Sequence, residues 1–350
     1  MNFIPMASAT VIGSFPHTDP SEACGLIFEK LKDIPAWPQL PRRDFLEDMN
    51  VQYSRGLPCL VVDHENRKVG FDTSGDMPGE LERFYSRVIE DDVNYFGLDG
   101  LHAAGFDCFM ESVRAGKAKG ARALKGQVSG PLTLGLMTDA VDGKYAIYKP
   151  DLFDAVVKSC AMNARWQARK LKEFTDTPII FFDEPSLSII GSGFYSVDRD
   201  LVARSFQEII GAIQQEGGLA GTHCCGNADW DDLLAMDLDI ISFDATDEII
   251  ADKFINAHNV NAFIERGGCV AWGIVPTIRN KIEVVDRTGV ENLFTGLLKR
   301  LAGKGIDEAA ILGRSIITPS CGTATLSLPL AEKVMVLLEG LSSTVRGRPA

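Results

Sequence analysis

The sequence has no long hydrophobic run and an excess of acidic over basic residues. No uninterrupted apolar run among its 350 residues approaches the roughly 20 residues that a helix needs to cross a bilayer. Residues 1–8 show no basic segment followed by a long apolar stretch, so we expect no signal peptide. Lys and Arg number 35 against 48 Asp and Glu, a formal net charge of −13, which would repel nucleic-acid phosphates. We therefore expect a cytoplasmic protein that binds neither membranes nor nucleic acids.

Cysteine is sparse for this length, with eight residues in the chain. In a protein of this size the sparse pattern favours reduced thiols over a disulfide framework. Cys59 and Cys269 lie in strand-like runs and Cys108 and Cys160 in helix-like ones, where we interpret them as small core side chains. Apolar residues at 45% and charged residues at 24% are typical of a globular enzyme.

Eight short apolar runs end in Gly, Pro or a polar residue, with helical stretches between them. Nearly continuous apolar runs are typical of parallel strands buried on both faces. The runs cover residues 10–14, 59–63, 124–129, 178–183, 219–223, 240–244, 270–274 and 315–318. The helix candidates include residues 151–174, 198–216, 290–303 and 329–341. This alternation predicts an α/β protein with a parallel sheet.

Eight strands separated by helices close most simply as a (β/α)8 TIM barrel. A doubly wound sheet is the alternative, but residues 12–16 hold one glycine and one proline and cannot form a Gly-rich dinucleotide motif. The stretch 64–123 is long and mixed and contains Gly70, Gly75 and Gly79. We interpret it as an insertion or lid after the second strand, within a single catalytic barrel domain spanning residues 1–350.

Polar residues stand at the carboxyl ends of several predicted strands. In a TIM barrel these ends converge on one face, where the active site lies. We therefore expect the following residues to come together: Ser14, Asp183, His223, Cys225, Asp244 and Cys321.

Three of these residues suggest a metal site. His223 and Cys225 are two positions apart, so on an extended segment their side chains point the same way, and Cys224 points to the opposite side. Cys321 would complete the set from another strand end. An imidazole and two thiols suit Zn2+. Asp244 is a fourth ligand, a hydrogen-bond partner of His223, or only a helix cap; a hydrogen-bonded core histidine beside filler cysteines is the alternative for the whole group.

The ligand types also indicate a reaction class. Sulfur donation lowers the Lewis acidity of zinc, so such a site generates hydroxide poorly. It suits a substrate thiol held as thiolate, the nucleophilic form. The sequence therefore predicts alkylation of a small-molecule thiol rather than hydrolysis.

Five motifs follow one another along nearly the whole chain. They are Ile12-Gly13-Ser14-Phe15-Pro16 with Thr18, Gly130-Pro131-Leu132-Thr133, Asp183-Glu184-Pro185, the His223/Cys225 pair, and Pro319-Ser320-Cys321-Gly322. In this order they resemble the C-terminal catalytic barrel of cobalamin-independent methionine synthase. The stretch 223–227 is also similar to the zinc motif of the methylcobamide:coenzyme M methyltransferases, in the uroporphyrinogen decarboxylase-like superfamily.

The resemblance implies a role for each matching residue. Zinc would be held by His223, Cys225 and Cys321, with Asp244 where the family has a longer glutamate. Ile12, Gly13 and Ser14 would bind the carboxylate of homocysteine, and Asp183 its ammonium group. That arrangement is sensible recognition of a zwitterion. The alternative for Asp183 is a helix cap before Pro185.

The departures from the family bear on the methyl donor. The N-terminal half of the family enzyme has no counterpart here, Ile189 stands where the family has a folate-binding glutamate, and residues 272–276 lack its histidine proton donor. We expect a methylcorrinoid donor, carried by a corrinoid protein, instead of methyltetrahydrofolate. Low-valent cobalt leaves without a proton, which suits the missing histidine.

Two other hypotheses remain. One is a methyltransferase acting on another thiol, such as coenzyme M. The other is a metal-free uroporphyrinogen decarboxylase-like protein, which would need basic residues for a polyacid; Arg42 and Arg43 are the early basic pair.

Overall fold

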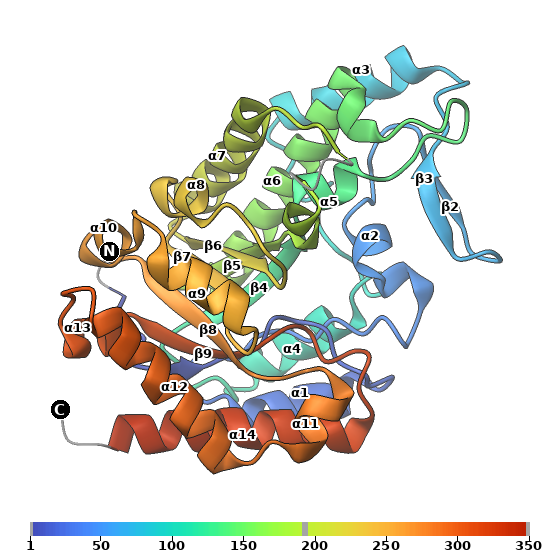
Figure 1. Cartoon of the computed structure of the whole chain (residues 1–350). Coiled ribbons are helices and arrows are strands. Elements are labelled where there is room, and N and C mark those ends of the chain that lie inside the picture. The colour runs from blue at the N-terminus through green and yellow to red at the C-terminus, as the bar shows by residue number, and fades with distance from the viewer. Residues whose placement is uncertain (1–2, 191–194, 348–350) are drawn as a thin grey trace.

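Seven parallel strands form one curled sheet in the computed structural model, which describes residues 3–190 and 195–347. The strand order is β1-β9-β8-β7-β6-β5-β4, and Figure 1 shows helices around the outside of the sheet. The strands are β1 (Ser8–Ala9), β4 (Leu124–Ser129), β5 (Pro178–Asp183), β6 (Leu219–Cys224), β7 (Ile240–Asp244), β8 (Cys269–Val275) and β9 (Ser315–Pro319). This arrangement confirms the predicted TIM-barrel-like α/β fold.

The helices include those expected at residues 151–174, 198–216, 290–303 and 329–341. In chain order they are α1 (Pro20–Lys30), α2 (Met49–Gln52), α3 (Met77–Ile89), α4 (Ala104–Arg114), α5 (Pro131–Gly135), α6 (Pro150–Lys172), α7 (Arg199–Gln215), α8 (Trp230–Ala235), α9 (Glu248–Asn256), α10 (Val260–Glu265), α11 (Arg279–Val284), α12 (Arg287–Ala302), α13 (Glu308–Gly313) and α14 (Leu328–Gly347). Short 3-10 turns are η1 (Phe45–Glu47), η2 (Ala146–Tyr148) and η3 (Pro185–Ser188). None of the described helices is long and apolar enough to cross a membrane.

Aspartate side chains cap many of these helices. The Asp19 carboxylate, for example, accepts a hydrogen bond of 2.7 Å from the Ser21 amide at the start of α1. The same type of cap begins α2, α3, α7, α8, α9, α12 and α13. Short acidic side chains satisfy the free amides of a first turn and favour its positive dipole end. Part of the acidic excess of the chain therefore serves helix formation.

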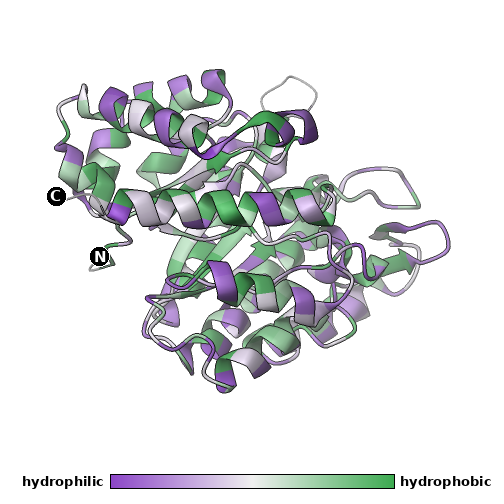
Figure 2. Ribbon diagram, turned by 90° about the horizontal axis from the view of Figure 1, so that it is seen from below, coloured by the Kyte–Doolittle hydropathy of each residue, from purple (hydrophilic) through white to green (hydrophobic). Residues whose placement is uncertain are grey.

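The core has an inner and an outer part, because alternate residues of each strand face opposite sides of the sheet. Ile179, Phe181, Ile240, Cys269 and Ala271 belong to a separate inner cluster. Their neighbours along the strands pack in the outer cluster with the helices. In Figure 2 the long C-terminal helix alternates between hydrophobic and hydrophilic residues, as a helix covering a core requires.

One predicted strand is misplaced. Residues 59–63 were expected to form the second barrel strand, but β2 (Leu60–Asp63) pairs antiparallel with β3 (Lys68–Phe71) in a separate two-stranded sheet. The first strand is also misplaced: β1 (Ser8–Ala9) ends before the predicted range 10–14, which forms no regular strand.

Residues 35–39 take the place next to β4 instead. The Trp37 amide donates to the Lys125 carbonyl at 3.2 Å, and the Gln39 amide donates to the Gly13 carbonyl at 3.0 Å. This segment therefore joins β4 to the chain that follows β1, between the two edges of the curled sheet. Pro35 and Pro38 have no amide hydrogen, so the segment forms only isolated bridges and lacks the pattern of a regular strand.

The range 64–123, predicted to be an insertion or lid, contains β3, α3 and α4. Phe109 of α4 stacks on Phe28 of α1 with ring centroids 5.0 Å apart, so α4 packs against a helix of the barrel. A lid role for this range, and a single catalytic domain over residues 1–350, stay predictions.

Candidate metal centre

The end of β6 presents His223 and Cys225 on one side of the strand. His223 is buried, and Cys225 is half-buried one residue beyond the strand end. Cys224 is fully buried in the outer cluster behind the sheet. The opposite orientation of Cys224, expected from the two-residue period of a strand, is confirmed.

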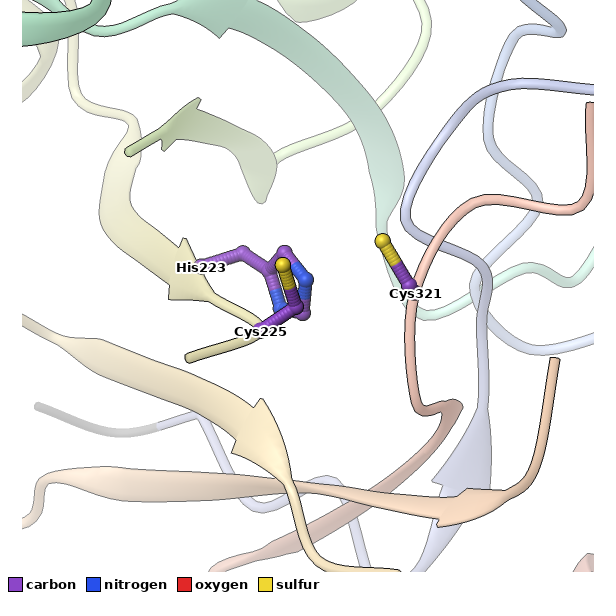
Figure 3. Close-up of side chains that lie close together, drawn as sticks. All are labelled: His223, Cys225 and Cys321. Atoms are coloured by element: carbon purple, nitrogen blue, oxygen red, sulfur yellow. The ribbon is translucent and has the colours of Figure 1, made fainter. Parts of the chain in front are cut away.

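Cys321 reaches the same place from β9. Two strands, β8 and β7, separate β9 from β6 in the sheet, so the curl of the sheet brings the two ends together across the barrel mouth. One ligand atom from each of His223, Cys225 and Cys321 lies within 4.8 Å of the others. Figure 3 shows the His223 and Cys225 side chains close together at the end of β6, with Cys321 approaching from a separate loop.

His223 is oriented by a neighbouring strand. Its Nδ1 lies 3.0 Å from Ser242 Oγ of β7, while its buried Nε2 has no hydrogen-bond partner. If Nδ1 donates its hydrogen to the hydroxyl, Nε2 keeps a lone pair, as a metal-ligating imidazole requires. An unpaired buried nitrogen is costly, and a metal ion would satisfy it.

The two thiols differ in acidity. The neighbouring side chains of Cys321 and His223 lower the pKa of the Cys225 thiol to about 4, although burial opposes this effect. The pKa of Cys321 is raised, because it hydrogen-bonds Cys225 and is buried. One thiolate is therefore favoured beside a histidine and a second sulfur, and this donor set fits a metal ion that prefers sulfur and nitrogen.

Asp244 is placed differently from the other three predicted ligands. Its Oδ1 accepts hydrogen bonds from the Thr246 amide at 2.8 Å and from the Thr246 hydroxyl at 2.6 Å. It is not among the residues whose ligand atoms gather within 4.8 Å. Burial raises the pKa of this carboxyl group. The side chain binds its own loop here, and its role as a ligand stays a prediction.

The predicted carboxylate-binding loop touches the loop that carries Cys321. A β-carbon on Gly322 would lie 2.0 Å from Ser14 Oγ, so glycine allows the two loops to meet. Thr323 holds the Ser14 carbonyl through its amide at 2.8 Å and its hydroxyl at 2.9 Å. Two motifs some 300 residues apart in sequence are thus brought to one place.

Asp183 ends β5 beside His223, with which it is in register on β6. Its buried Oδ1 has no hydrogen-bond partner. Burial raises the pKa of its carboxyl group to about 6, although the charges of Lys125 and His223 oppose this effect. Asp183 thus offers an unused acceptor next to the cluster.

Sequence reasoning missed Lys125, a fully buried residue of β4. Its Nζ donates to the Ile12 carbonyl at 2.6 Å and lies 4.5 Å from the centroid of the Phe181 ring. Burial lowers the pKa of this amine to about 8. The available signal in the sequence was a lysine within a predicted strand. The hydrogen bond from Lys125 to the Ile12 carbonyl holds the predicted carboxylate loop in place.

Glu184 links two of the sequence motifs. Its buried carboxylate accepts hydrogen bonds from the amides of Leu132 at 2.8 Å and Thr133 at 3.0 Å, and from the Thr133 hydroxyl at 2.7 Å. Burial raises the pKa of the carboxyl group to about 8, against these hydrogen bonds. Glu184, the residue after Asp183 in its motif, therefore anchors the start of α5 and holds the end of β5 in place.

Comparisons with known proteins show the fold. No protein-family model matches the chain, and a search of curated proteins finds no match. A methyltransferase from Methanosarcina mazei is similar with a TM-score of 0.56 and 16% identity, covering 97% of this chain and 94% of that one. A putative vitamin-B12 independent methionine synthase from Listeria monocytogenes has a TM-score of 0.53 and 12% identity, covering 94% and 85%. At these identities the likeness establishes a common fold only.

A third structure matches a smaller part. A B12-independent methionine synthase from Shewanella sp. W3-18-1, in complex with selenomethionine, has a TM-score of 0.46 and 17% identity over 68% of this chain. The chain spans 66% of that protein, just under two thirds of its length.

Proposed function

We propose that this protein is a zinc-dependent thiol S-methyltransferase that makes methionine from homocysteine. The observation that carries the proposal is the gathering of His223, Cys225 and Cys321, with ligand atoms within 4.8 Å, at the carboxyl end of the barrel. That face is where TIM-barrel enzymes place their active sites. Two thiols and one imidazole match the ligand preferences of zinc and leave a coordination position for a substrate atom.

When bound, zinc would supply a site that keeps the substrate sulfur as thiolate at neutral pH. The protein residues would hold the remainder of the amino acid. The Ile12–Ser14 loop contacts the Cys321 loop through Gly322, and this closeness supports the proposal that its amides and the Ser14 hydroxyl bind the carboxylate. Asp183 offers an unpaired, buried oxygen for the ammonium group.

The reaction is a methyl transfer. The substrate thiol gives its proton to solvent, a bond forms between sulfur and the methyl carbon, and the bond between that carbon and the donor breaks. The electron pair of the broken bond stays with the donor. A corrinoid donor would keep this electron pair as low-valent cobalt after losing its methyl group and would take no proton, so a donor of this class requires no general acid from the protein.

The donor assignment rests on residues of this chain. Ile189, at the position of the folate-binding glutamate in the family it resembles, is an exposed aliphatic residue after η3. Residues 272–276 carry no histidine to protonate a leaving amine. We therefore favour a methylcorrinoid, presented by a corrinoid protein, over methyltetrahydrofolate.

A decarboxylase-like function receives less support. Arg43 forms an ion pair with the fully buried Glu47 and donates to the backbone carbonyls of residues 100 and 101. Its charge is engaged within the fold and is poorly placed to bind a polyacid substrate.

The experiment supplies zinc-loaded protein and homocysteine with either methylcobalamin or methyltetrahydrofolate. We expect methionine to form from methylcobalamin. Methionine formed only from the folate would overturn the donor assignment. The matched control is Cys269→Ser, which replaces a buried thiol at the opposite end of the barrel. Equal activity of Cys225→Ser and this control would overturn the proposed function.

A further inference from the structure

Lys125 carries a positive charge in the interior of the barrel. It is the only buried lysine in the part of the chain that the structure describes. Its Nζ donates to the Ile12 carbonyl at 2.6 Å and lies 4.5 Å from the centroid of the Phe181 ring. Burying a charge is costly unless the charge is paired, and the proposed function assigns no role to this one.

The Ile12 carbonyl belongs to a loop whose acceptors are all held by the protein. After the Ile12 carbonyl, which the ammonium group holds, the Gly13 carbonyl accepts from the Gln39 amide at 3.0 Å. The Ser14 carbonyl accepts from the amide and from the hydroxyl of Thr323, at 2.8 and 2.9 Å. Three successive carbonyls are therefore fixed from three different parts of the fold.

The donors of the same loop are free. Among the described residues, the amides of Gly13 and Ser14 donate to no protein acceptor. Gly13 is buried and Ser14 is half-buried, and a buried amide without a partner is costly. Successive free amides of this kind favour an anion. The loop therefore offers donors to the substrate carboxylate and keeps its acceptors away from it.

Lys125 acts on the first of these amides through one peptide unit. The Ile12 carbonyl and the Gly13 amide belong to the same planar trans peptide and point in opposite directions. Hydrogen bonds in such a chain polarise one another, so an ammonium group at the carbonyl makes the amide a stronger donor. Gln127, two residues along β4 and thus on the same face as Lys125, packs on this peptide: a β-carbon on Gly13 would lie 2.7 Å from Gln127 Cδ.

The charge balance of the site also favours a role for Lys125. Burial lowers the pKa of its amine to about 8, and the charge of Asp183 opposes this effect, so the ammonium form prevails at neutral pH. In the proposed function Asp183 pairs with the ammonium group of the substrate. Lys125 is then the cation that balances the substrate carboxylate, and such attraction is stronger in a buried site than in water.

We propose that Lys125 is a positioning residue for anion recognition: through the peptide between Ile12 and Gly13, its ammonium group orients and polarises the loop amides that bind the substrate carboxylate. Lys125 does not touch the substrate in this arrangement. The inference rests on the proposed function, to which it adds a residue of the barrel interior. Without that residue the site should discriminate less between thiols with and without a carboxylate.

The test compares two thiols that differ only in the carboxylate, L-homocysteine and 3-aminopropane-1-thiol. Each is titrated into zinc-loaded protein in a calorimeter, and bound zinc is measured afterwards. We expect wild type to prefer homocysteine by about 100-fold or more. Lys125→Met should reduce the ratio of the two dissociation constants about tenfold or more, through weaker homocysteine binding, with zinc content and 3-aminopropane-1-thiol binding unchanged.

The matched control is Lys158→Met, which removes a lysine paired with Glu208 at 3.1 Å on the outer helix α6 and should leave the ratio unchanged. Lys125→Gln, a polar neutral replacement, is measured in the same way where Lys125→Met fails to fold. A merely structural role of Lys125 would weaken both thiols equally. That result, an unchanged ratio, or equal binding of the two thiols by wild type would overturn this inference alone. Binding of neither thiol by wild type would overturn the proposed function as well.

Discussion

Cys225 and Cys321 carry the sulfur atoms on which metal binding would depend. Replacing either by serine removes a soft thiolate and substitutes a hydroxyl, which binds zinc poorly. We expect Cys225→Ser and Cys321→Ser each to lower bound zinc from one per chain to less than about a tenth of that after dialysis. Elemental analysis of purified protein checks this. Cys269→Ser should retain full occupancy, and zinc retained in both ligand variants would contradict the assignment.

Lys125 gives a pH dependence that differs in sign from that of an ordinary surface lysine. Its pKa is lowered to about 8 in the fold, against about 10.4 in an unfolded chain. Between these values the unfolded state binds more protons, so stability rises with pH. Relative to Lys125→Met, wild-type protein should gain stability from pH 8 upward, by about 3 kcal/mol at most.

Urea denaturation at several pH values between 8 and 10 measures the difference between the two proteins. The charge of Asp183 acts on Lys125, but the pKa of its carboxyl group, about 6, lies below this window. Thiols that titrate there are common to both proteins and cancel. A difference that stays constant or falls with pH would show that the amine is not held in the buried, desolvated state.

The two-residue alternation of side chains along a strand predicted the orientation of some site residues but not of others. His223, Cys225 and Cys224 follow from alternation along one strand, so their orientations could be read from the sequence. The role of Glu184 could not, because its hydrogen bonds to Leu132 and Thr133 join two motifs some 50 residues apart in sequence. Burial of a polar side chain by distant elements has no local sequence signal.

At the scale of elements, residues 35–39 close the barrel next to β4, but their two prolines kept them from being predicted as a strand. Residues 59–63 are mostly apolar and include two valines, and were predicted to be the second strand, yet residues 60–63 pair with β3 in a separate hairpin. Apolar composition identifies a strand without identifying its partner. Seven other runs fall on or next to strands of the parallel sheet, because burial on both faces requires the continuous apolar pattern.

A pair of glycine substitutions tests the place of residues 35–39. A β-carbon on Gly105, at the start of α4, would lie 1.8 Å from the Pro38 carbonyl oxygen, whereas a β-carbon on Gly25 in α1 would meet no atom from the rest of the protein within 4 Å. Gly105→Ala should therefore displace the segment and cost about 3 kcal/mol or more. Gly25→Ala should stabilise the protein by about 0.5–1 kcal/mol. Urea unfolding measures both, and equal effects would argue against the close packing of α4 on this segment.

The whole molecule matters to the site because its parts come from distant stretches of chain. His223 and Cys225 follow β6, Cys321 follows β9, and the Ser14 loop follows β1. Only the curled sheet brings them together. Alternating strands and helices predicted that sheet, and the convergence of strand ends predicted the location of the site; the loop contact between Ser14 and Gly322 depends on tertiary packing.

A site assembled this way exists only in the folded chain, so zinc should stabilise folding. A ligand that binds the native state alone adds about 2.7 kcal/mol when its free concentration is 100 times its dissociation constant. We expect that increase in the free energy of unfolding when zinc is buffered at such a concentration, measured by urea denaturation against metal-free protein. Cys225→Ser controls for zinc bound by unfolded thiols and should show little gain. Equal stabilisation of both proteins would place the zinc elsewhere, whereas a gain confined to wild type would tie the metal to the place where the ends of β6 and β9 approach each other.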